Sequence, residues 1–204
     1  MKRAILLLAA SAALFFMSQS HVQAETVNSS SKSQFATFGG GCFWCMQAVF
    51  ERVPGVKNVV CGYSGGHVDQ PSYEQVCSHK TGHAEVVQIE FEPAEVSYGH
   101  LLNVFWEAHD PTSLNRQGDD EGPQYRSVVF YHDETQHQAV LKAKAGEQQN
   151  LTRPIVTEIV PLKKFWPAEE YHQHYFEKNP SAGYCAFVIR PKVAKLQKEG
   201  VIAK

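Results

Sequence analysis

Three consecutive glycines followed by a cysteine, Gly39-Gly40-Gly41-Cys42, constrain the fold of this chain more than any other feature. The residues before them, 35–38, predict a short strand, and residues 43–52 predict a helix that ends at Pro54-Gly55. Because glycines allow tight turns and close approach of the backbone to its neighbours, we expect the strand to pass directly into the helix. The sequence therefore places Cys42 at the start of a helix.

This position favours a reactive thiol at Cys42. The amides of a glycine turn and a helix N-terminus favour negative charge, so we expect a lowered pKa for Cys42 and a nucleophilic or redox role. The alternative is a packed structural cysteine. Cys45 completes a C-x-x-C pattern, which occurs both in dithiol redox centres and in zinc sites.

The rest of the chain predicts interleaved strands and helices. Together they favour an α+β fold, a two-layer α/β sandwich with a mixed β-sheet, flanking helices and long functional loops. The segment from Asn179 predicts a loop that carries Cys185, then a short apolar stretch and a basic tail. We expect strands at 56–61, 86–91, 128–131 and 155–160, helices at 97–109 and 133–149, and a long polar loop at 110–125.

The N-terminus has the pattern of a secretory signal peptide at residues 1–24, with Lys2 and Arg3 before an apolar stretch and Ala24 at the cleavage site. The stretch is shorter than the roughly 20 residues that span a bilayer, although an uncleaved anchor is the alternative. Residues 25–33 predict a flexible lead-in, and residues 34–204 a single domain. We therefore expect an exported protein, periplasmic in preference to secreted, with no membrane association after cleavage.

Charge and cysteine content narrow the function. With 19 Lys and Arg against 21 Asp and Glu, the net charge of -2 gives no basis for binding nucleic acid. An oxidising compartment favours disulfides, but an odd number of cysteines leaves at least one thiol unpaired. The five cysteines are Cys42, Cys45, Cys61, Cys77 and Cys185.

Glu85 is a candidate general acid. It shares strand parity with Val87, Ile89 and Phe91, so its carboxyl is expected on the apolar side, where desolvation favours the protonated form. A strand-end carboxylate that reaches solvent is the alternative.

Other polar residues carry weaker signals. Tyr73 and Tyr125 lie on predicted loops, where functional residues concentrate, although either could serve packing alone. Asp120 belongs to an acidic turn that lacks EF-hand spacing. His172 and His174 could complete a zinc site with the C-x-x-C cysteines, but side chains two apart on a helix point away from each other.

Several motifs occur in the order typical of the A-class peptide methionine sulfoxide reductases, and the chain resembles that family over nearly all of residues 35–192. The motifs are Gly41-Cys42-Phe43-Trp44, Gly62-Tyr63-Ser64-Gly65-Gly66, Pro71-Ser72-Tyr73-Glu74-Gln75-Val76-Cys77, Thr81-Gly82-His83-Ala84-Glu85, Trp106 with His109-Asp110-Pro111, Arg116-Gln117-Gly118, Gln124-Tyr125-Arg126-Ser127, and Asn179-Pro180 with Gly183-Tyr184-Cys185.

The resemblance implies an enzyme that reduces free and protein-bound methionine S-sulfoxide, without a cofactor or metal, and that acts as a monomer. It also implies a role for each matching residue. These are Cys42 as the nucleophile, Phe43 and Trp44 as the apolar cage for the substrate methyl, Glu85 as the acid with Tyr73 and Tyr125 assisting, and Asp120 as a residue that fixes substrate and water.

The resemblance further implies that a sulfenic acid on Cys42 condenses with a second thiol, and that a thioredoxin-like reductant opens the resulting disulfide. Cys185 is the expected resolving residue, with Cys45 and Cys77 as alternatives. Cys45 is an extra thiol beside the nucleophile, and Gln47 replaces the Glu of many members. Two rival functions remain: a thiol-disulfide oxidoreductase that uses Cys42 and Cys45, and a metal-binding or adhesive domain that uses cysteines and histidines.

Overall fold

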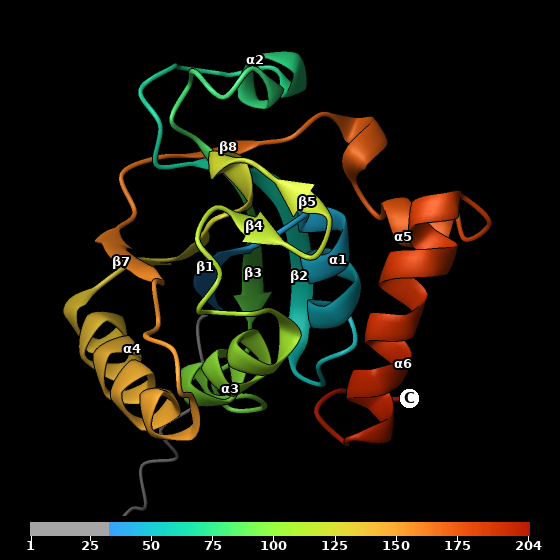
Figure 1. The fold of residues 1–204 in the computed structure, drawn as a ribbon. Helices are drawn as coiled ribbons and strands as arrows, with labels where there is room; N and C mark the ends of the chain where they lie inside the picture. The colour runs from blue at the N-terminus through green and yellow to red at the C-terminus, as the bar shows by residue number, and fades with distance from the viewer. Residues whose placement is uncertain (1–32) are drawn as a thin grey trace, which may run out of the picture. The chain divides into compact units, whose positions relative to one another are not determined.

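The computed structural model describes residues 33–204, so the predicted signal peptide and nearly all of the predicted lead-in lie outside the described residues. A six-stranded sheet with the order β7-β6-β1-β3-β2-β8 forms its centre (Figure 1). Every neighbouring pair is antiparallel except β6 and β7, which are parallel. The strands are β1 (Gln34–Gly40), β2 (Val56–Ser64), β3 (Ala84–Phe91), β6 (Ser127–Tyr131), β7 (Glu158–Pro161) and β8 (Phe165–Pro167).

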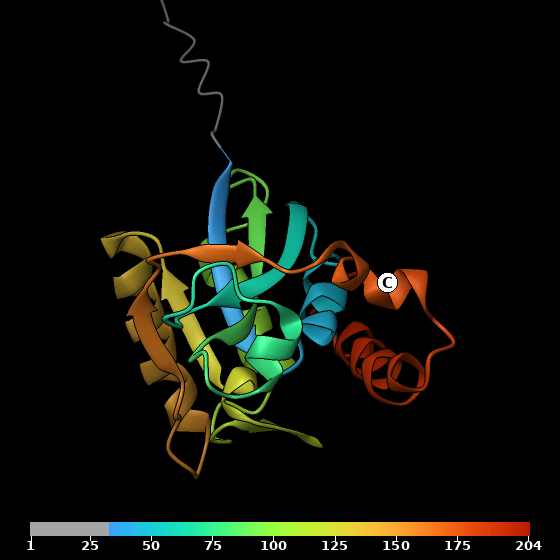
Figure 2. The ribbon, with the colours of Figure 1, turned by 90° about the horizontal axis from the view of Figure 1, so that it is seen from above.

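Helices form the second layer, against one face of this sheet (Figure 2). None of the described helices is long and apolar enough to span a membrane. A two-stranded hairpin, β4 (Arg116–Gln117) with β5 (Asp120–Glu121), lies outside the main sheet. The α-helices are α1 (Phe43–Phe50), α2 (Tyr73–Cys77), α3 (Tyr98–Ala108), α4 (Glu134–Glu147), α5 (Tyr175–Lys178) and α6 (Arg190–Lys198). The remaining helical turns are η1 (Pro123–Tyr125), η2 (Gln148–Asn150), η3 (Glu170–His172) and the π-helical η4 (Cys185–Ile189).

The predicted fold class and most predicted elements are confirmed, because local signals and tertiary burial agree in them. In α3, for example, the Ser97 side chain accepts a hydrogen bond from the His100 N–H, and the apolar residues Leu101, Leu102 and Phe105 are buried.

The prediction of a loop around Cys185 is wrong. Cys185 lies in η4, which runs directly into α6, and its side chain is 0% exposed. The sequence does contain a helical stripe here, Cys185, Ile189, Val193 and Leu196, spaced four, four and three residues apart and buried throughout. The exposed Phe187 between them obscures that spacing.

The departure at Gln47 has a structural role. Its amide nitrogen donates to the Val59 carbonyl at 2.8 Å, and its amide oxygen accepts from the His174 N–H at 2.7 Å, so it connects α1 to β2 and to the C-terminal region. An ionised glutamate could accept the second bond but could not donate the first.

Gly62 on β2 lies against β8 with no room for a side chain. A Cβ there would lie 2.5 Å from the Trp166 carbonyl oxygen, which is backbone and cannot rotate away. We expect Gly62→Ala to lower the free energy of unfolding by about 1–3 kcal/mol, measured by urea unfolding.

Gly146 on α4 provides the matched control, because a Cβ there meets no atom within 4 Å. Gly146→Ala should raise the free energy of unfolding by up to about 1 kcal/mol, since alanine favours the helix. Equal unfolding midpoints for Gly62→Ala and the unmodified protein would contradict the close approach of β2 and β8.

Candidate active site

The predicted substrate-side residues meet in one cavity of about 170 Å³. They come from α1, α2, β3, β5 and η1, which are far apart in the sequence but adjacent in the fold. The lining is Cys42, Phe43, Trp44, Tyr73, Glu85, Asp120, Tyr125 and Tyr184. Tyr184 is the one member to which the sequence assigned no role, although it belongs to a motif that carries the resemblance.

The glycine turn sets the geometry of this cavity. Gly41 has a φ of +93°, and a Cβ on Gly39 would lie 2.9 Å from the Glu85 carbonyl oxygen. The turn therefore brings the first turn of α1 directly against β3. There the Phe43 N–H donates to the Glu85 carboxylate oxygen Oε2 at 3.0 Å.

Glu85 is a buried carboxyl, as its strand parity predicts, with 2% of its surface exposed. Burial raises its pKa to about 8, and the negative charges of Asp120 and Cys45 act in the same direction. The Phe43 hydrogen bond opposes this shift without cancelling it. Glu85 is therefore largely protonated at neutral pH and can donate a proton into the cavity.

The predicted low pKa of Cys42 is wrong. Burial, followed by the hydrogen bond to Cys45 and the charge of Glu85, raises the pKa of Cys42 well above its ordinary value. Cys42 is the N-cap residue of α1, yet within residues 33–204 its side chain forms no capping hydrogen bond. Since Glu85 accepts the hydrogen bond from the Phe43 N–H, the start of the helix stabilises the Glu85 carboxyl group instead of a Cys42 thiolate.

The acidic thiol of the pair is Cys45. The hydrogen bond from Cys42 is the largest influence and lowers the pKa of Cys45 to about 7, helped by the Lys192 charge and opposed by burial. Cys42 lines the cavity with Glu85, whereas Cys45 is not among the described residues that line it. The two thiols therefore share one proton near neutral pH, and Cys42 is the one that faces the cavity with Glu85.

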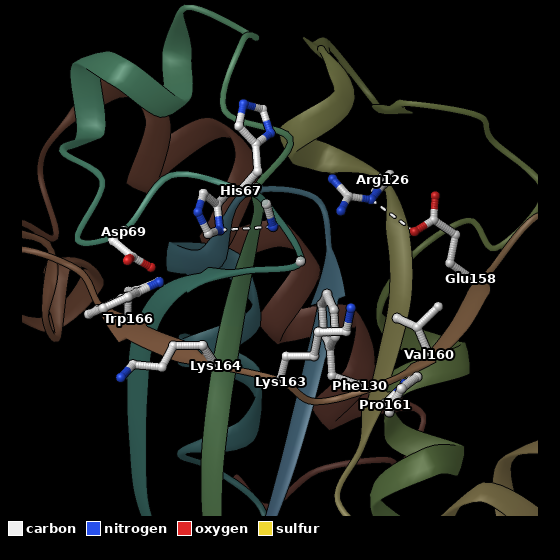
Figure 3. Close-up of a pocket in the computed structure, with 13 residues that line it drawn as sticks. His67, Asp69, Arg126, Phe130, Glu158, Val160, Pro161, Lys163, Lys164 and Trp166 are labelled. Atoms are coloured by element: carbon white, nitrogen blue, oxygen red, sulfur yellow. Dashed lines mark hydrogen bonds and ion pairs between the residues drawn. The ribbon is translucent and has the colours of Figure 1, made fainter.

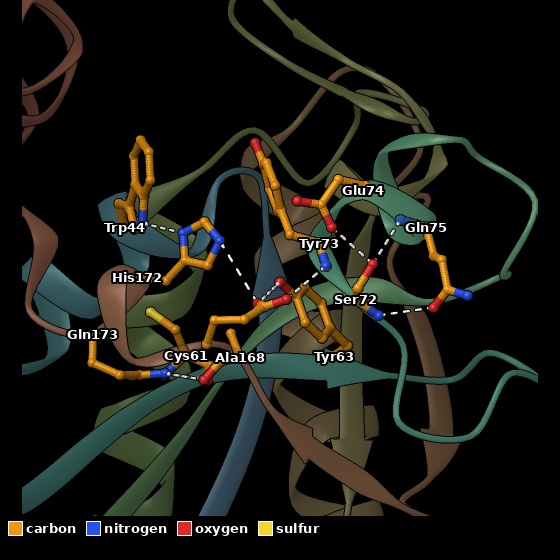
Figure 4. A network of polar contacts seen from close by, with 11 residues as sticks. Trp44, Cys61, Tyr63, Ser72, Tyr73, Glu74, Gln75, Ala168, His172 and Gln173 are labelled. Atoms are coloured by element: carbon orange, nitrogen blue, oxygen red, sulfur yellow. Dashed lines mark hydrogen bonds and ion pairs between the residues drawn. The ribbon is translucent and has the colours of Figure 1, made fainter.

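Aromatic packing fixes Trp44 as one wall. Its ring stacks on Tyr175 with centroids 3.7 Å apart and an interplanar angle of 5°. Its indole Nε1–H donates to His172 Nδ1 at 3.2 Å, as Figure 4 shows. His172, considered at the sequence level as a zinc ligand, thus orients the cage.

Glu169 supports the opposite wall, and no sequence signal distinguished it from its acidic neighbours. Its carboxylate accepts from the Tyr73 N–H at 2.8 Å and from the Tyr63 hydroxyl at 2.9 Å (Figure 4). Burial alone would raise the pKa of Glu169, but hydrogen bonds that include these two hold it below its usual value. The carboxylate lies 3.8 Å from His172 Nε2, which is too long for a hydrogen bond, and because burial lowers the pKa of His172 this contact is not an ion pair at neutral pH.

Three tyrosines line the same cavity as Cys42 and Glu85. Burial is the main reason that the pKa values of Tyr73, Tyr125 and Tyr184 are raised, so all three remain protonated donors. The Tyr184 hydroxyl donates to Asp120 Oδ2 at 2.5 Å and contacts Cys45 Sγ at 3.6 Å.

The remaining cysteines differ in setting, and all five are free thiols in the described chain. Cys61 is buried on β2, where its thiol donates to the Phe43 carbonyl oxygen at 3.6 Å. Cys77 is half-buried at the end of α2. Cys185 is buried in η4.

The metal-binding hypothesis receives no support from the cysteines. Among the described residues, one group has the spacing of metal ligands, Glu51, His174 and Glu177, and it contains no cysteine. The His174 Nδ1 already pairs with Glu51 at 2.6 Å.

A larger cavity of about 450 Å³ lies between β6, β7 and β8 (Figure 3). Its walls include Phe130 and Trp166, and Arg126 pairs there with Glu158 at 3.1 Å. None of the described residues that line it is a cysteine. Size alone therefore does not locate the reactive thiol.

Comparisons with known proteins agree with this geometry. The family model described as "Peptide methionine sulfoxide reductase" matches residues 34–204. "Peptide methionine sulfoxide reductase MsrA" of Nautilia profundicola is 55% identical over 163 residues, which cover 80% of this chain and 94% of that protein.

Solved structures show the same fold. Reduced Mxr1 from Saccharomyces cerevisiae has a TM-score of 0.71 and 34% identity, covering 76% of this chain and 91% of its own. Mxr1 in complex with Trx2 has a TM-score of 0.51 and 25% identity, and the match covers 72% of this chain and 86% of the Mxr1 chain.

The proton shared by the two thiols can be located by titration. We expect the thiolate absorbance at 240 nm to show a step near pH 7 that Cys45→Ser removes, because this step belongs to Cys45. Cys77→Ser is the control and should retain the step. Persistence of the step in Cys45→Ser would assign the acidic thiol to another cysteine.

Proposed function

The chain belongs to the peptide methionine sulfoxide reductase family and reduces methionine sulfoxide to methionine; we propose that this chemistry occurs in the cavity between Cys42 and Glu85 and acts on the S epimer, free or in proteins. One observation carries the proposal. A carboxyl that is protonated at neutral pH and a thiol line the same small aromatic cavity. Sulfoxide oxygen is a poor leaving group until it is protonated, so the reaction requires this combination.

In the proposed first step the Cys42 sulfur attacks the sulfoxide sulfur while Glu85 delivers a proton to the oxygen. An S–S bond forms between Cys42 and the substrate, the substrate S–O bond then breaks as its oxygen transfers to the Cys42 sulfur, and the S–S bond opens as methionine leaves. Cys42 remains as a sulfenic acid, oxidised by the two electrons that the sulfoxide gains. The proton lost by the Cys42 thiol finally restores Glu85. Tyr73 and Tyr125 add hydroxyl donors on the oxygen side.

The aromatic residues serve binding. Phe43 is fully buried and Trp44 is held by Tyr175 and His172, so the two present a preformed apolar surface for the substrate methyl group. Asp120, fixed by the Tyr184 hydroxyl, is the polar group at the cavity edge that orients substrate and water. An apolar cage also keeps bulk water away from the proton on Glu85.

We propose Cys45, rather than the expected Cys185, as the first resolving thiol. Residues three apart on a helix have Cβ atoms about 5–6 Å apart, so a small movement brings Cys42 and Cys45 within disulfide range. Cys42 and Cys45 line one cavity together, whereas Cys185 is not among the described residues that line either cavity containing Cys42. Condensation of the sulfenic acid with Cys45 forms the S–S bond and releases water.

A thioredoxin-like dithiol protein then reduces the disulfide in this proposal. The support is the solved complex of Mxr1 with Trx2. The same dithiol would serve a thiol-disulfide oxidoreductase, but that rival gives no role to a buried protonated Glu85.

We also propose that residues 34–204 act as one monomeric catalytic domain after export to the periplasm. The support is the extent of the family match and the signal-peptide pattern of residues 1–24. Detection of Glu25 as the N-terminus of the exported protein tests the localisation.

Glu85→Gln should slow methionine formation by about 100-fold or more, because an amide cannot supply the proton. In the unmodified enzyme the single-turnover rate should fall as pH rises through about 8, since the acid form of Glu85 exists below its pKa. The assay uses reduced protein with separated S and R epimers of a methionine sulfoxide peptide.

The control for this assay is Glu170→Gln, which changes an exposed carboxylate close in sequence to Glu169. It should leave the rate unchanged. Release of methionine from neither epimer by the unmodified protein would overturn the proposed chemistry. An unaffected rate in Glu85→Gln would favour the oxidoreductase rival.

Cys45→Ser should still release about one equivalent of methionine in a single turnover, but Cys42 should then remain as a sulfenic acid that a dimedone probe captures. Cys185→Ser should form a Cys42 to Cys45 disulfide, seen by peptide mapping. A Cys42 to Cys185 disulfide in the unmodified protein, with none to Cys45, would restore Cys185 as the resolving residue.

A further inference from the structure

Cys42 separates two cavities. Besides the substrate cavity, a second cavity of about 360 Å³ is bounded by the glycine turn, the end of α3, the β4–β5 hairpin and α6. Cys42, Asp120 and Tyr184 line both cavities. The hydrogen bond between the Tyr184 hydroxyl and Asp120 therefore lies in the wall that the two cavities share.

The second cavity gives access to the other thiol. Among the described residues, Cys45 belongs to the lining of the second cavity and not to that of the substrate cavity. An incoming thiolate that attacks Cys45 from this side does not have to pass through the substrate cavity. It also expels the Cys42 sulfur, which returns as the reduced nucleophile facing the substrate.

Two exposed apolar side chains belong to η4, which borders the second cavity. Val188 lines the cavity and is 37% exposed, and Phe187, its neighbour in the sequence, is 84% exposed. Such side chains gathered beside a reactive group indicate a protein contact. Both belong to a π-helical turn, a distortion that occurs frequently at functional sites.

One wall of the second cavity, helix α6, carries positive charge. It contributes Lys192 and Lys195 to the lining, whereas the segment at the end of α3 and the β4–β5 hairpin contribute Glu107, Asp110 and Asp120. Between Arg190 and Lys198 this helix has four basic residues and no acidic one, in a chain whose net charge is -2. In Figure 1 and Figure 2, α6 lies beside α1, the helix that carries Cys45. A partner that docks on the α6 side of the cavity should therefore present acidic residues to this helix.

We propose that this surface, formed by Phe187, Val188 and the basic side of α6, docks the reductant: a dithiol protein whose reactive cysteine is surrounded by apolar and acidic residues. This inference rests on the proposed function, because it assumes a Cys42 to Cys45 disulfide. Substrate and reductant then approach the dithiol through different cavities. Methionine on a large oxidised protein need not leave the surface before the reductant binds.

The exchange balances in two steps. The thiolate of the reductant attacks Cys45 Sγ, the Cys42–Cys45 S–S bond breaks, and a mixed disulfide to Cys45 forms as the Cys42 thiolate leaves. The second thiol of the reductant then attacks its own sulfur in the mixed disulfide and releases Cys45. The reductant loses two electrons and two protons, and the two cysteines gain them.

The test compares two reductants with the same enzyme. Phe187→Ala should raise the KM for bacterial thioredoxin, kept reduced by thioredoxin reductase and NADPH, by about fivefold or more, the loss expected for an aromatic interface residue. Turnover with dithiothreitol should not change, because a small dithiol needs no docking surface. Leu141→Ala, which truncates an exposed apolar residue on α4, is the matched control.

The contribution of the positive charge on α6 to docking can be tested with two lysines of that helix. Lys195→Glu, which alters the cavity lining, should raise the KM for thioredoxin more at low than at high ionic strength, whereas Lys198→Glu, outside the lining, should not. Equal effects of the two charge reversals would overturn the proposed role of α6.

A trapping experiment locates the attack. Thioredoxin whose second active-site cysteine is replaced by serine should form a mixed disulfide that mass mapping assigns to Cys45. Assignment of the mixed disulfide to Cys42 or Cys185 would overturn the inference. So would a Phe187→Ala variant whose KM for thioredoxin is unchanged, or whose KM is raised for an oxidised protein substrate and not for thioredoxin. Turnover of the unmodified enzyme with dithiothreitol reports separately on the proposed function.

Discussion

The hydrogen bond from the Phe43 N–H to the Glu85 carboxylate determines the chemistry of this site. It joins the first residue of α1 to β3 in a buried environment, and it exists because the glycine turn brings the two elements together. The favourable end of the helix therefore stabilises a carboxyl group and not the neighbouring thiol. Burial still outweighs this bond, so Glu85 remains a proton donor at neutral pH.

With the helix start occupied and the acidic position of the pair held by Cys45, Cys42 keeps its proton at neutral pH. The shared proton makes Cys45 the acidic partner, and the same closeness prepares the pair for disulfide formation. Tyr184 links the dithiol to Asp120, and hence the α1 side of the site to the β4–β5 hairpin. The proposed acid, nucleophile and resolving thiol thus lie close together, and the two cavities that reach them share a wall.

The residues that support the site show how the fold preorganises it. Glu169 holds the start of α2 through Tyr73, and His172 holds the indole of Trp44. Neither needs to touch substrate. Glu169 fixes the backbone of Tyr73 and His172 fixes the side chain of Trp44, and both of these residues line the cavity, so little order has to be gained when substrate binds. The C-terminal region supplies both residues, and through η4 and α6 it also supplies the wall of the second cavity.

Sequence by itself determined the strand–turn–helix around Cys42, the inward parity of Glu85 and most element positions, because glycine conformation and hydrophobic periodicity act over a few residues. The tertiary structure alone decided that Glu85 receives the helix N–H, that Cys45 and not Cys42 is the acidic thiol, and that Cys185 is buried in a helix. The physical reason is that pKa values and burial depend on groups brought together from distant segments. Their competition for one hydrogen bond or one proton is set by three-dimensional distance and cannot be read from local pattern.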